Sequence, residues 1–275
     1  MADASSDTGA GTDTINFADL PASLTAYQQG EVAVLRLSRP DKRNALNDPT
    51  ILGIERFFQV LPETAKAVVI HGAGDHFSAG LDLGELTERD VPQAITHSRM
   101  WHRVFEQIQY GRVPVIAVLH GAVVGGGLEL AAAAHIRVAE RSTYYGLPEG
   151  QRGIFVGGGG AMRLPRLIGV SRMMEMMLTG RTYDAEQGFA IGLSHYVVDA
   201  GTGLAKGMEL AQRVAANAPL TNFAVLHALP RIAEADPASG LVLESLMAAV
   251  AQDSAEAKQR LRDFLEKRAA KVLRD

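Results

Sequence analysis

The feature that most constrains the fold of this 275-residue chain is a series of apolar, β-rich runs separated by segments with helical spacing. The predicted strands are Val32–Ser38, Ala67–Gly74, Val113–Gly121 and His135–Glu140. Strands that are apolar nearly throughout are typical of a parallel sheet with both faces covered. Between them, apolar residues at helical spacing predict helices at Pro49–Val60 and Ser98–Tyr110. The pattern therefore predicts an α/β fold.

Beyond about Ser171 the chain reads as helical throughout. The predicted helices are Ser171–Leu178, Ala185–Ile191, Leu204–Asn217, Asn222–Ala235, Gly240–Ala251 and Ala255–Arg274. Ser171 and Asp184, the latter with Gln187 three residues on, are the expected N-caps, and Pro219 and Pro237 the expected breakers. We expect three parts: a disordered leader at 1–16, an α/β core at 17–200 and a helical region at 201–275.

Composition excludes several classes of function. The chain has no cysteine, which rules out disulfides, thiol nucleophiles and cysteine metal sites. Its net charge is −4, and its basic residues form no stripe of the kind that binds nucleic acid. No apolar run approaches the roughly 18 residues of a membrane span. The leader lacks the basic start and apolar stretch of a signal peptide. We therefore expect a cytoplasmic protein with no nucleic-acid or membrane partner.

The glycine clusters do not match the common nucleotide-binding or hydrolase motifs. The dinucleotide pattern G-x-G-x-x-G fails from Gly125 because its last position is Leu130, and the lysine of a P-loop is missing. The serine-hydrolase elbow G-x-S-x-G fails because His76 replaces its first glycine. His97 and His102 are five positions apart, a poor spacing for two ligands on one helix face, so we predict no metal site.

The stretch HGAVVGGGLEL, residues His120–Leu130, places three glycines and one carboxylate in an otherwise small and apolar segment. We interpret it as a strand followed by a helix that begins near Gly126. Backbone N–H groups at a helix start lack partners, so they can hold a developing oxyanion. Glu129 lies three residues further on, on the same helix face. The alternative is structural: glycines for close packing, and a first-turn glutamate favoured by the helix dipole. This stretch alone does not decide between the two.

Two further stretches share this character. HFSAGLDLGEL, residues His76–Leu86, follows the second predicted strand, carries a turn glycine, and offers a second backbone donor. The glycine-rich segment Tyr144–Gly169 contains another carboxylate, Glu149, beside Pro148 and Gly150. These stretches favour a catalytic interpretation of Glu129.

In combination, these blocks resemble the enoyl-CoA hydratase/isomerase (crotonase) superfamily, from about Val32 to the C-terminal helices. The matching blocks are RPDKRNAL (39–46), FSAGLDL (77–83), PVIAVLHGAVVGGGLEL (114–130), LPEGQRGIFVGGGG (147–160), RLPRLIG (163–169) and LTGRTYDAEQGFAIGLSHYVV (178–198). The resemblance implies a spiral of ββα units with a helical C-terminal trimerisation region. It also implies a homo-oligomer, either a trimer or a dimer of trimers.

The resemblance also implies a site. Glu129 and Glu149, twenty positions apart, would handle one water molecule, and the N–H groups of Leu81 and Gly126 would form an oxyanion hole. Trp101 and Phe105 are candidates for the wall of the acyl pocket. Coenzyme A would enter as part of the substrate, with no metal and no other cofactor. The residues expected to border the coenzyme A thioester are Arg43, Ala45, Leu46, Ala79, Asp82, Leu83 and Gly125.

Retention of both glutamates favours hydration of a 2-enoyl-CoA, alone or followed by C–C cleavage or thioester hydrolysis. The alternatives are an enoyl-CoA isomerase that uses Glu149 alone, and a non-catalytic or RNA-binding member of the superfamily. Some positions depart from the usual hydratase pattern: Leu81 replaces a small residue and is expected to narrow the acyl pocket, His135 replaces an Asp, and Val156 replaces a Pro. Ala161 and Met162 replace a Thr-Gln pair.

Overall fold

The structure is a computed structural model that describes residues 17, 19–82, 84, 88–266 and 268. Its main sheet has six strands in the order β1-β2-β3-β4-β6-β9, with β1 antiparallel to β2 and the others parallel. The strands are β1 (Leu24–Gln29), β2 (Val32–Leu37), β3 (Ala67–Gly72), β4 (Val115–Leu119), β6 (Ile136–Glu140) and β9 (Tyr196–Val198). A smaller sheet joins β5 (Ala122–Val124), β7 (Tyr144–Gly146) and β8 (Tyr183–Asp184). The leader predicted at 1–16 lies outside the described residues.

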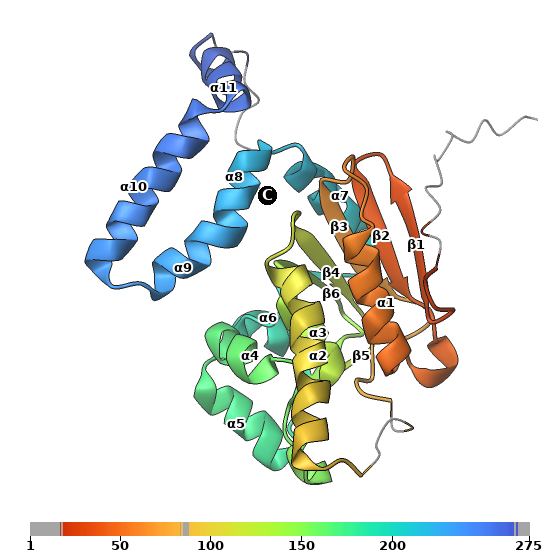
Figure 1. Ribbon diagram of the computed structural model, residues 1–275. Coiled ribbons are helices and arrows are strands. Elements are labelled where there is room, and N and C mark those ends of the chain that lie inside the picture. The colour runs from red at the N-terminus through yellow and green to blue at the C-terminus, as the bar shows by residue number, and fades with distance from the viewer. Residues whose placement is uncertain (1–16, 18, 83, 85–87, 267, 269–275) are drawn as a thin grey trace, which may run out of the picture.

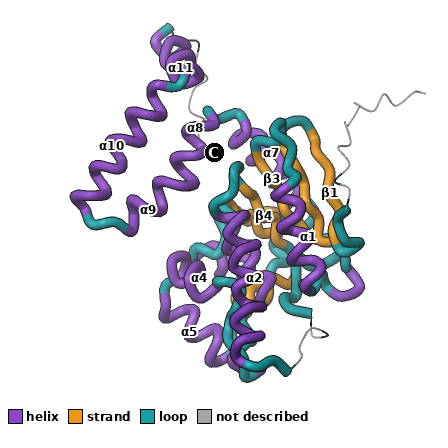
Figure 2. The backbone as a smooth tube through the Cα atoms, viewed as in Figure 1, coloured by secondary structure: helices purple, strands orange, loops and turns teal. Residues whose placement is uncertain are grey.

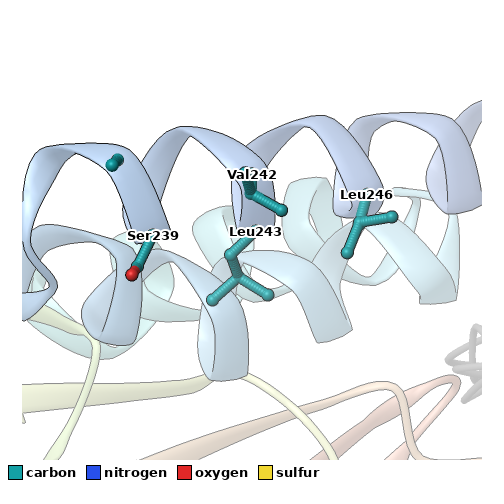
Figure 3. Close-up of a pocket in the computed structure, with 5 residues that line it drawn as sticks. Ser239, Val242, Leu243 and Leu246 are labelled. Carbon is teal, nitrogen blue, oxygen red and sulfur yellow. The ribbon is translucent and has the colours of Figure 1, made fainter.

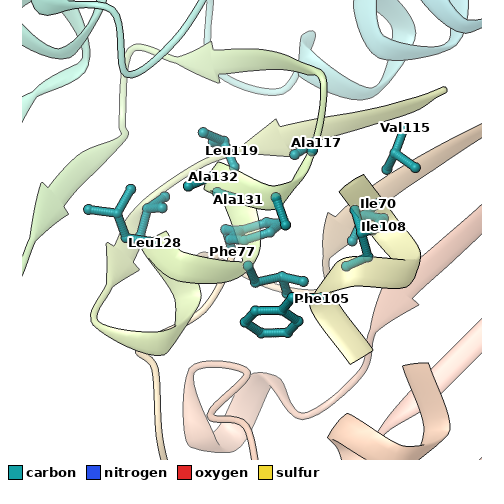
Figure 4. Packing of buried hydrophobic residues seen from close by; sticks show 14 of the residues in the cluster. Ile70, Phe77, Phe105, Ile108, Val115, Ala117, Leu119, Leu128, Ala131 and Ala132 are labelled. Atoms are coloured by element: carbon teal, nitrogen blue, oxygen red, sulfur yellow. The ribbon is translucent and has the colours of Figure 1, made fainter. Parts of the chain in front are cut away.

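The four predicted strands are confirmed as β2, β3, β4 and β6, and they form the centre of the main sheet (Figure 2). Their side chains are buried on both faces, as nearly continuous apolar runs predict. On one face lie α1 (Asp48–Gln59), α2 (Val91–Gln109) and α3 (Gly126–Ala133), in a core that includes Phe77, Phe105 and Leu128 (Figure 4). On the other face lies α7 (Gly203–Ala215), whose Leu210 and Ala211 pack against the strands. The predicted helical region at 201–275 therefore begins with a helix that covers the sheet.

Helix α2 begins seven residues before the predicted start at Ser98. Its N-cap is Asp90, which accepts a hydrogen bond from the Gln93 N–H at 2.8 Å, while the Gln93 side chain bonds back to the Asp90 N–H. This capping box satisfies two backbone donors that would otherwise lack partners. The apolar side chains in the first turns of α2 are exposed. The spacing of the buried apolar residues therefore did not reveal these turns.

Between β7 and the C-terminal helices, the chain forms further helices: α4 (Gly160–Ile168), α5 (Val170–Thr179) and α6 (Ala185–Ile191). Asp184 and Gln187 form the predicted capping box of α6. The predicted cap at Ser171 is wrong, because α5 begins at Val170 after Gly169. Helix α4 was not predicted; it follows a glycine run and contains Pro165, yet burial of its apolar face holds it in place.

The last helices project away from the sheet as an arm (Figure 1). They are α8 (Pro219–Phe223), a π-helical segment (Ala224–Ala228), α9 (Leu229–Glu234), α10 (Pro237–Asp253) and α11 (Ala255–Leu265). The side chains of Val242 and Leu246 on α10 are more than half exposed. Together with Ala238, Ser239 and Leu243 they line a surface pocket of about 500 Å³ (Figure 3). None of the helices in the described part of the chain is long and apolar enough to cross a bilayer.

Candidate active site

The glycine triplet forms the junction between β5 and α3, as predicted. Gly125 is the N-cap of α3, with φ of +54°, and Gly126 is the first helical residue. A Cβ atom on Gly125 would lie 2.7 Å from Oε1 of Glu149, and one on Gly126 would lie 2.9 Å from the ring of Trp101. These glycines therefore leave the space in which Glu149 and Trp101 approach the start of the helix.

The backbone N–H groups of Leu81 and Gly126 lie near each other at this junction. A Cβ atom on Gly126 would lie 3.5 Å from the Leu81 nitrogen. Leu81 is paired with Leu46, which donates to the Gly80 carbonyl and accepts from the Asp82 N–H, both at 2.8 Å. Among the residues that the structure describes, no acceptor bonds to the N–H of Leu81 or of Gly126. Both donors are therefore free to bind a ligand oxygen.

Ser78 fixes the spacing between these two donors. Its N–H donates to the Ala122 carbonyl at 2.9 Å, and its carbonyl accepts from the Val124 N–H at 3.1 Å. Its hydroxyl donates to the Asn44 carbonyl at 2.9 Å. A Cβ atom on Gly127 would lie 2.5 Å from the Ser78 carbonyl oxygen. The chain after β3 is thus joined to β5 by an isolated β-bridge between Ser78 and Val123, and it lies close against the start of α3.

Glu129 lies in the first turn of α3, and only 3% of its surface is exposed. Its Oε1 atom accepts hydrogen bonds from the Gly158 N–H at 2.9 Å and the Gly160 N–H at 2.7 Å. Burial raises the pKa of this carboxyl group, and the two N–H donors and the charge of Arg163 act against that rise. Burial is the largest of these effects, so the pKa of Glu129 lies above its usual value.

Glu149 immediately precedes the 3-10 turn Gly150–Arg152, and 7% of its surface is exposed. Its Oε2 atom is buried and has no hydrogen-bond partner among the described residues. Burial, followed by the negative charge of Glu129, raises the pKa of Glu149 to about 7. At a pKa of about 7, Glu149 is therefore about half protonated at neutral pH.

Both glutamates, Leu81 and Gly126 line one cavity of about 660 Å³. The structure therefore brings together residues from three separate stretches of the sequence. The rest of the wall is mainly apolar and comes from α2 and from the segment after the 3-10 turn. Its apolar side chains are Val91, Ala94, Ile95, Trp101, Ile154, Phe155 and Val156.

A sequence model of the enoyl-CoA hydratase/isomerase family matches residues 27–272 of this chain. The chain belongs to this family. A short-chain-enoyl-CoA hydratase from Clostridium acetobutylicum is 30% identical over 244 residues, which cover 88% of this chain and 94% of that protein.

Solved structures agree with this assignment. One from Rhodopseudomonas palustris, described as a candidate enoyl-CoA hydratase, is 61% identical, covers 91% of this chain and 97% of its own, and has a TM-score of 0.88. An enoyl-CoA hydratase from Bacillus anthracis is 30% identical, with coverage of 90% and 97% and a TM-score of 0.83. The predicted crotonase-like α/β fold with a helical C-terminal region is therefore confirmed.

In this family member, the two aromatic candidates for the acyl wall lie in different places. Trp101 lines the cavity, whereas Phe105 is fully buried behind it, with ring centroids 5.6 Å apart in an edge-to-face arrangement. The sequence did not single out Val91 and Ile95 as wall residues, because the expected start of α2 was too late. The capping-box pattern of Asp90 and Gln93 marks the correct start of α2.

The residues predicted to border coenzyme A form a separate group beside the cavity. The Ala79 N–H donates to the Arg43 carbonyl at 2.9 Å, and Ala45 and Leu46 follow Arg43. None of these four residues lines the cavity itself. Gly125 lies at the helix start, next to Glu149.

Asp82 is occupied by other contacts. It accepts from Nη2 of Arg39 at 2.6 Å and from the Gly84 N–H at 3.0 Å, and these bonds lower its pKa. Leu83 lies outside the described residues. His97 bonds to Asp48 at 2.8 Å, and no metal-binding group of three or more His, Asp or Glu side chains occurs in the described part of the chain.

Proposed function

We propose that this protein is an enoyl-CoA hydratase that adds water across the 2,3 double bond of a 2-enoyl-CoA thioester. One observation carries the proposal: two buried carboxyl groups line the same cavity as two backbone N–H groups that have no partner among the described residues. The names of its relatives support the same reaction class. The residues at 43–46 and 79 would lie along coenzyme A, and the cavity would take the acyl group.

In the proposed reaction, the N–H groups of Leu81 and Gly126 hold the thioester oxygen. Attack of water at C3 moves negative charge to this oxygen, where an enolate forms. Loss of one such donor typically costs about 3–4 kcal/mol of transition-state stabilisation. The start of α3 adds its partial positive charge at the same place. Because the thioester and these donors stabilise the enolate, the reaction requires no metal or redox cofactor.

The two glutamates divide the proton transfers between them. Glu129, held by two N–H donors near Arg163, accepts the proton of the attacking water. Glu149, with a pKa of about 7, helps to position that water and donates its proton to C2. General acid and general base catalysis each contribute roughly 10²–10⁴-fold to a rate.

The direct test is incubation of the purified protein with crotonyl-CoA, followed by loss of the enoyl absorbance and identification of the 3-hydroxyacyl product. A 3-enoyl-CoA in a parallel assay tests for isomerisation, and an RNA shift assay at physiological salt tests for a binding function. Turnover of the 3-enoyl-CoA without hydration of crotonyl-CoA would overturn the proposal in favour of an isomerase.

The pH dependence of hydration follows from Glu149. The proton donor must be protonated in the free enzyme, and with a pKa of about 7 its protonated fraction falls tenfold for each pH unit well above 7. We expect kcat/KM for crotonyl-CoA to fall along an alkaline limb with a midpoint near pH 7. A value of kcat/KM that stays constant from pH 6 to pH 9 contradicts this assignment of the acid.

We also propose that the arm of α8 to α11 packs against other copies of the chain in a trimer or a dimer of trimers. The exposed apolar side chains of α10, including Leu241, Val242, Leu246 and Val250, support this proposal. Light scattering is expected to give three or six chain masses. Replacement of Leu246 by Glu is expected to shift that mass downward, whereas a monomeric wild-type protein contradicts the proposal. A cytoplasmic location also remains a prediction.

A further inference from the structure

A run of four glycines, Gly157–Gly160, supplies both N–H donors to Glu129, and side chains hold this run from two sides. The Ser98 hydroxyl on α2 donates to the Gly157 carbonyl at 2.7 Å. The N–H of that same peptide, on Gly158, donates to Glu129 at 2.9 Å. One peptide group therefore joins Ser98 to Glu129, so a rotation of the peptide would break both bonds.

Arg163 holds the following peptide. Its Nη1 donates to the Gly158 carbonyl at 3.0 Å, and its Nε donates to Oε1 of Gln109 at 2.7 Å. Only 4% of Arg163 is exposed. Gly159 has φ of +95°, and a Cβ atom there would lie 2.3 Å from Nη1 of Arg163. The guanidinium thus packs directly beneath the glycine run, fixed at its other side to the end of α2.

We propose that Arg163 and Ser98 are positioning residues, which fix the glycine run and thereby the orientation and charge of Glu129. The inference rests on the proposed role of Glu129 as the base. Glycine peptides have unusual conformational freedom, so a run of four needs external bonds to keep two N–H groups aimed at one oxygen. Neither side chain needs to touch the substrate to act in this way.

The same arrangement places a cation close enough to Glu129 to interact with its charge. Burial raises the pKa of Glu129, and the charge of Arg163 opposes part of that rise. The other titratable groups that face this pair are His102, Glu106 and Tyr110 on α2, and Glu149 after β7. Of these, Glu106 and Tyr110 face Arg163, and Glu149 faces Glu129. Loss of Arg163 therefore leaves Glu129 without its nearby cation.

The test compares Arg163→Gln, Arg163→Lys and Ser98→Ala. We expect Arg163→Gln to lower kcat for crotonyl-CoA by about 10²-fold, because misplaced catalytic groups cost about that much, with KM changed by no more than about twofold. Arg163→Lys keeps the charge but cannot make both bonds in the same fork geometry, so it restores kcat only in part. Ser98→Ala suits a helix and is expected to fold; its kcat falls by about tenfold.

Two matched controls change the same chemical groups on the same helices. Arg166→Gln removes an arginine one turn further along α4, which pairs with Glu234 instead of the glycine run. Thr96→Ala removes a hydroxyl from α2 that bonds only to the Pro92 carbonyl. Both controls are expected to keep kcat within about twofold of the wild-type value.

A direct titration separates this inference from the proposed reaction. Carbon-13 NMR of labelled glutamate, with Glu129→Gln to assign the signal, reports the pKa of Glu129 without any substrate. We expect Arg163→Gln to raise this pKa by about one unit or more and Arg163→Lys to restore it. If the wild type hydrates no enoyl-CoA but the titration shifts, the reaction proposal fails and the inference stands. If the wild type is active and Arg163→Gln changes neither kcat nor the titration, the inference is overturned.

Discussion

Replacement of Glu149 by Gln is expected to lower kcat for 2-enoyl-CoA hydration by roughly 10²–10⁴-fold. The amide has nearly the same shape as the carboxyl group but carries no proton that it can donate to C2. Because Oε2 of Glu149 makes no hydrogen bond to the residues that the structure describes, the substitution breaks no hydrogen bond of that atom. The measurement is the rate of absorbance loss with crotonyl-CoA, at saturating substrate and pH 7.

Glu129→Gln is expected to cause a loss of similar size for a different reason. It removes the base, and its amide NH₂ group also meets the N–H donors of Gly158 and Gly160 if it takes the position of Oε1. Glu186→Gln, on the exposed face of α6, is the control and is expected to have wild-type activity. Wild-type turnover in either active-site variant would exclude the proposed division of proton transfers.

A second large loss is expected from Gly125→Ala. The added Cβ atom would lie 2.7 Å from Oε1 of Glu149, closer than any real contact, so the carboxyl group must move. A displacement of about 1 Å in a catalytic group costs on the order of 10²-fold in rate. We expect kcat to fall by that factor, with the folded state retained.

Gly169→Ala is the matched control for backbone strain. Gly169 is also the N-cap of a helix with positive φ, at +81°, but a Cβ atom there would meet nothing within 4 Å. Both variants are expected to lose about 1–3 kcal/mol of stability, measured by thermal unfolding. Only Gly125→Ala is expected to lose activity. Equal activities in the two variants would show that the Gly125 site tolerates a side chain.

The sequence predicts those elements of the fold whose apolar residues form a clear pattern or whose ends carry a clear capping motif. The central strands are found because burial on both faces makes them apolar nearly throughout. Edge strand β1 (LTAYQQ) was missed because its buried positions are few and its residues mixed. Helix α4 was missed because glycines and Pro165 disfavour a helix locally, and only tertiary packing of Leu164 and Ile168 reverses that preference.

The residues of the candidate site also divide into those that the sequence reveals and those that it does not. Gly126, Glu129 and Glu149 could be nominated from sequence because glycines and lone carboxylates stand out in apolar segments, and Leu81 was nominated through the resemblance of FSAGLDL to the family. Arg163 could not, since a single arginine in a basic segment reads as an exposed residue. Its importance depends on which carbonyl it reaches, and that is fixed only when α2 and α4 pack together.

The two ends of α2 contribute to the molecule in different ways. Trp101, Phe105 and Ile108 in its second half are part of the core, whereas Val91 and Ile95 in its first half are 72% and 58% exposed and line the cavity. Substitutions at such exposed positions usually change stability by no more than about 0.5 kcal/mol. The two backbone N–H donors of Leu81 and Gly126, whose spacing Ser78 fixes, lie outside α2. In the proposed hydratase, acyl preference can therefore diverge among descendants of this chain through changes at Val91 and Ile95, while the catalytic residues are inherited unchanged.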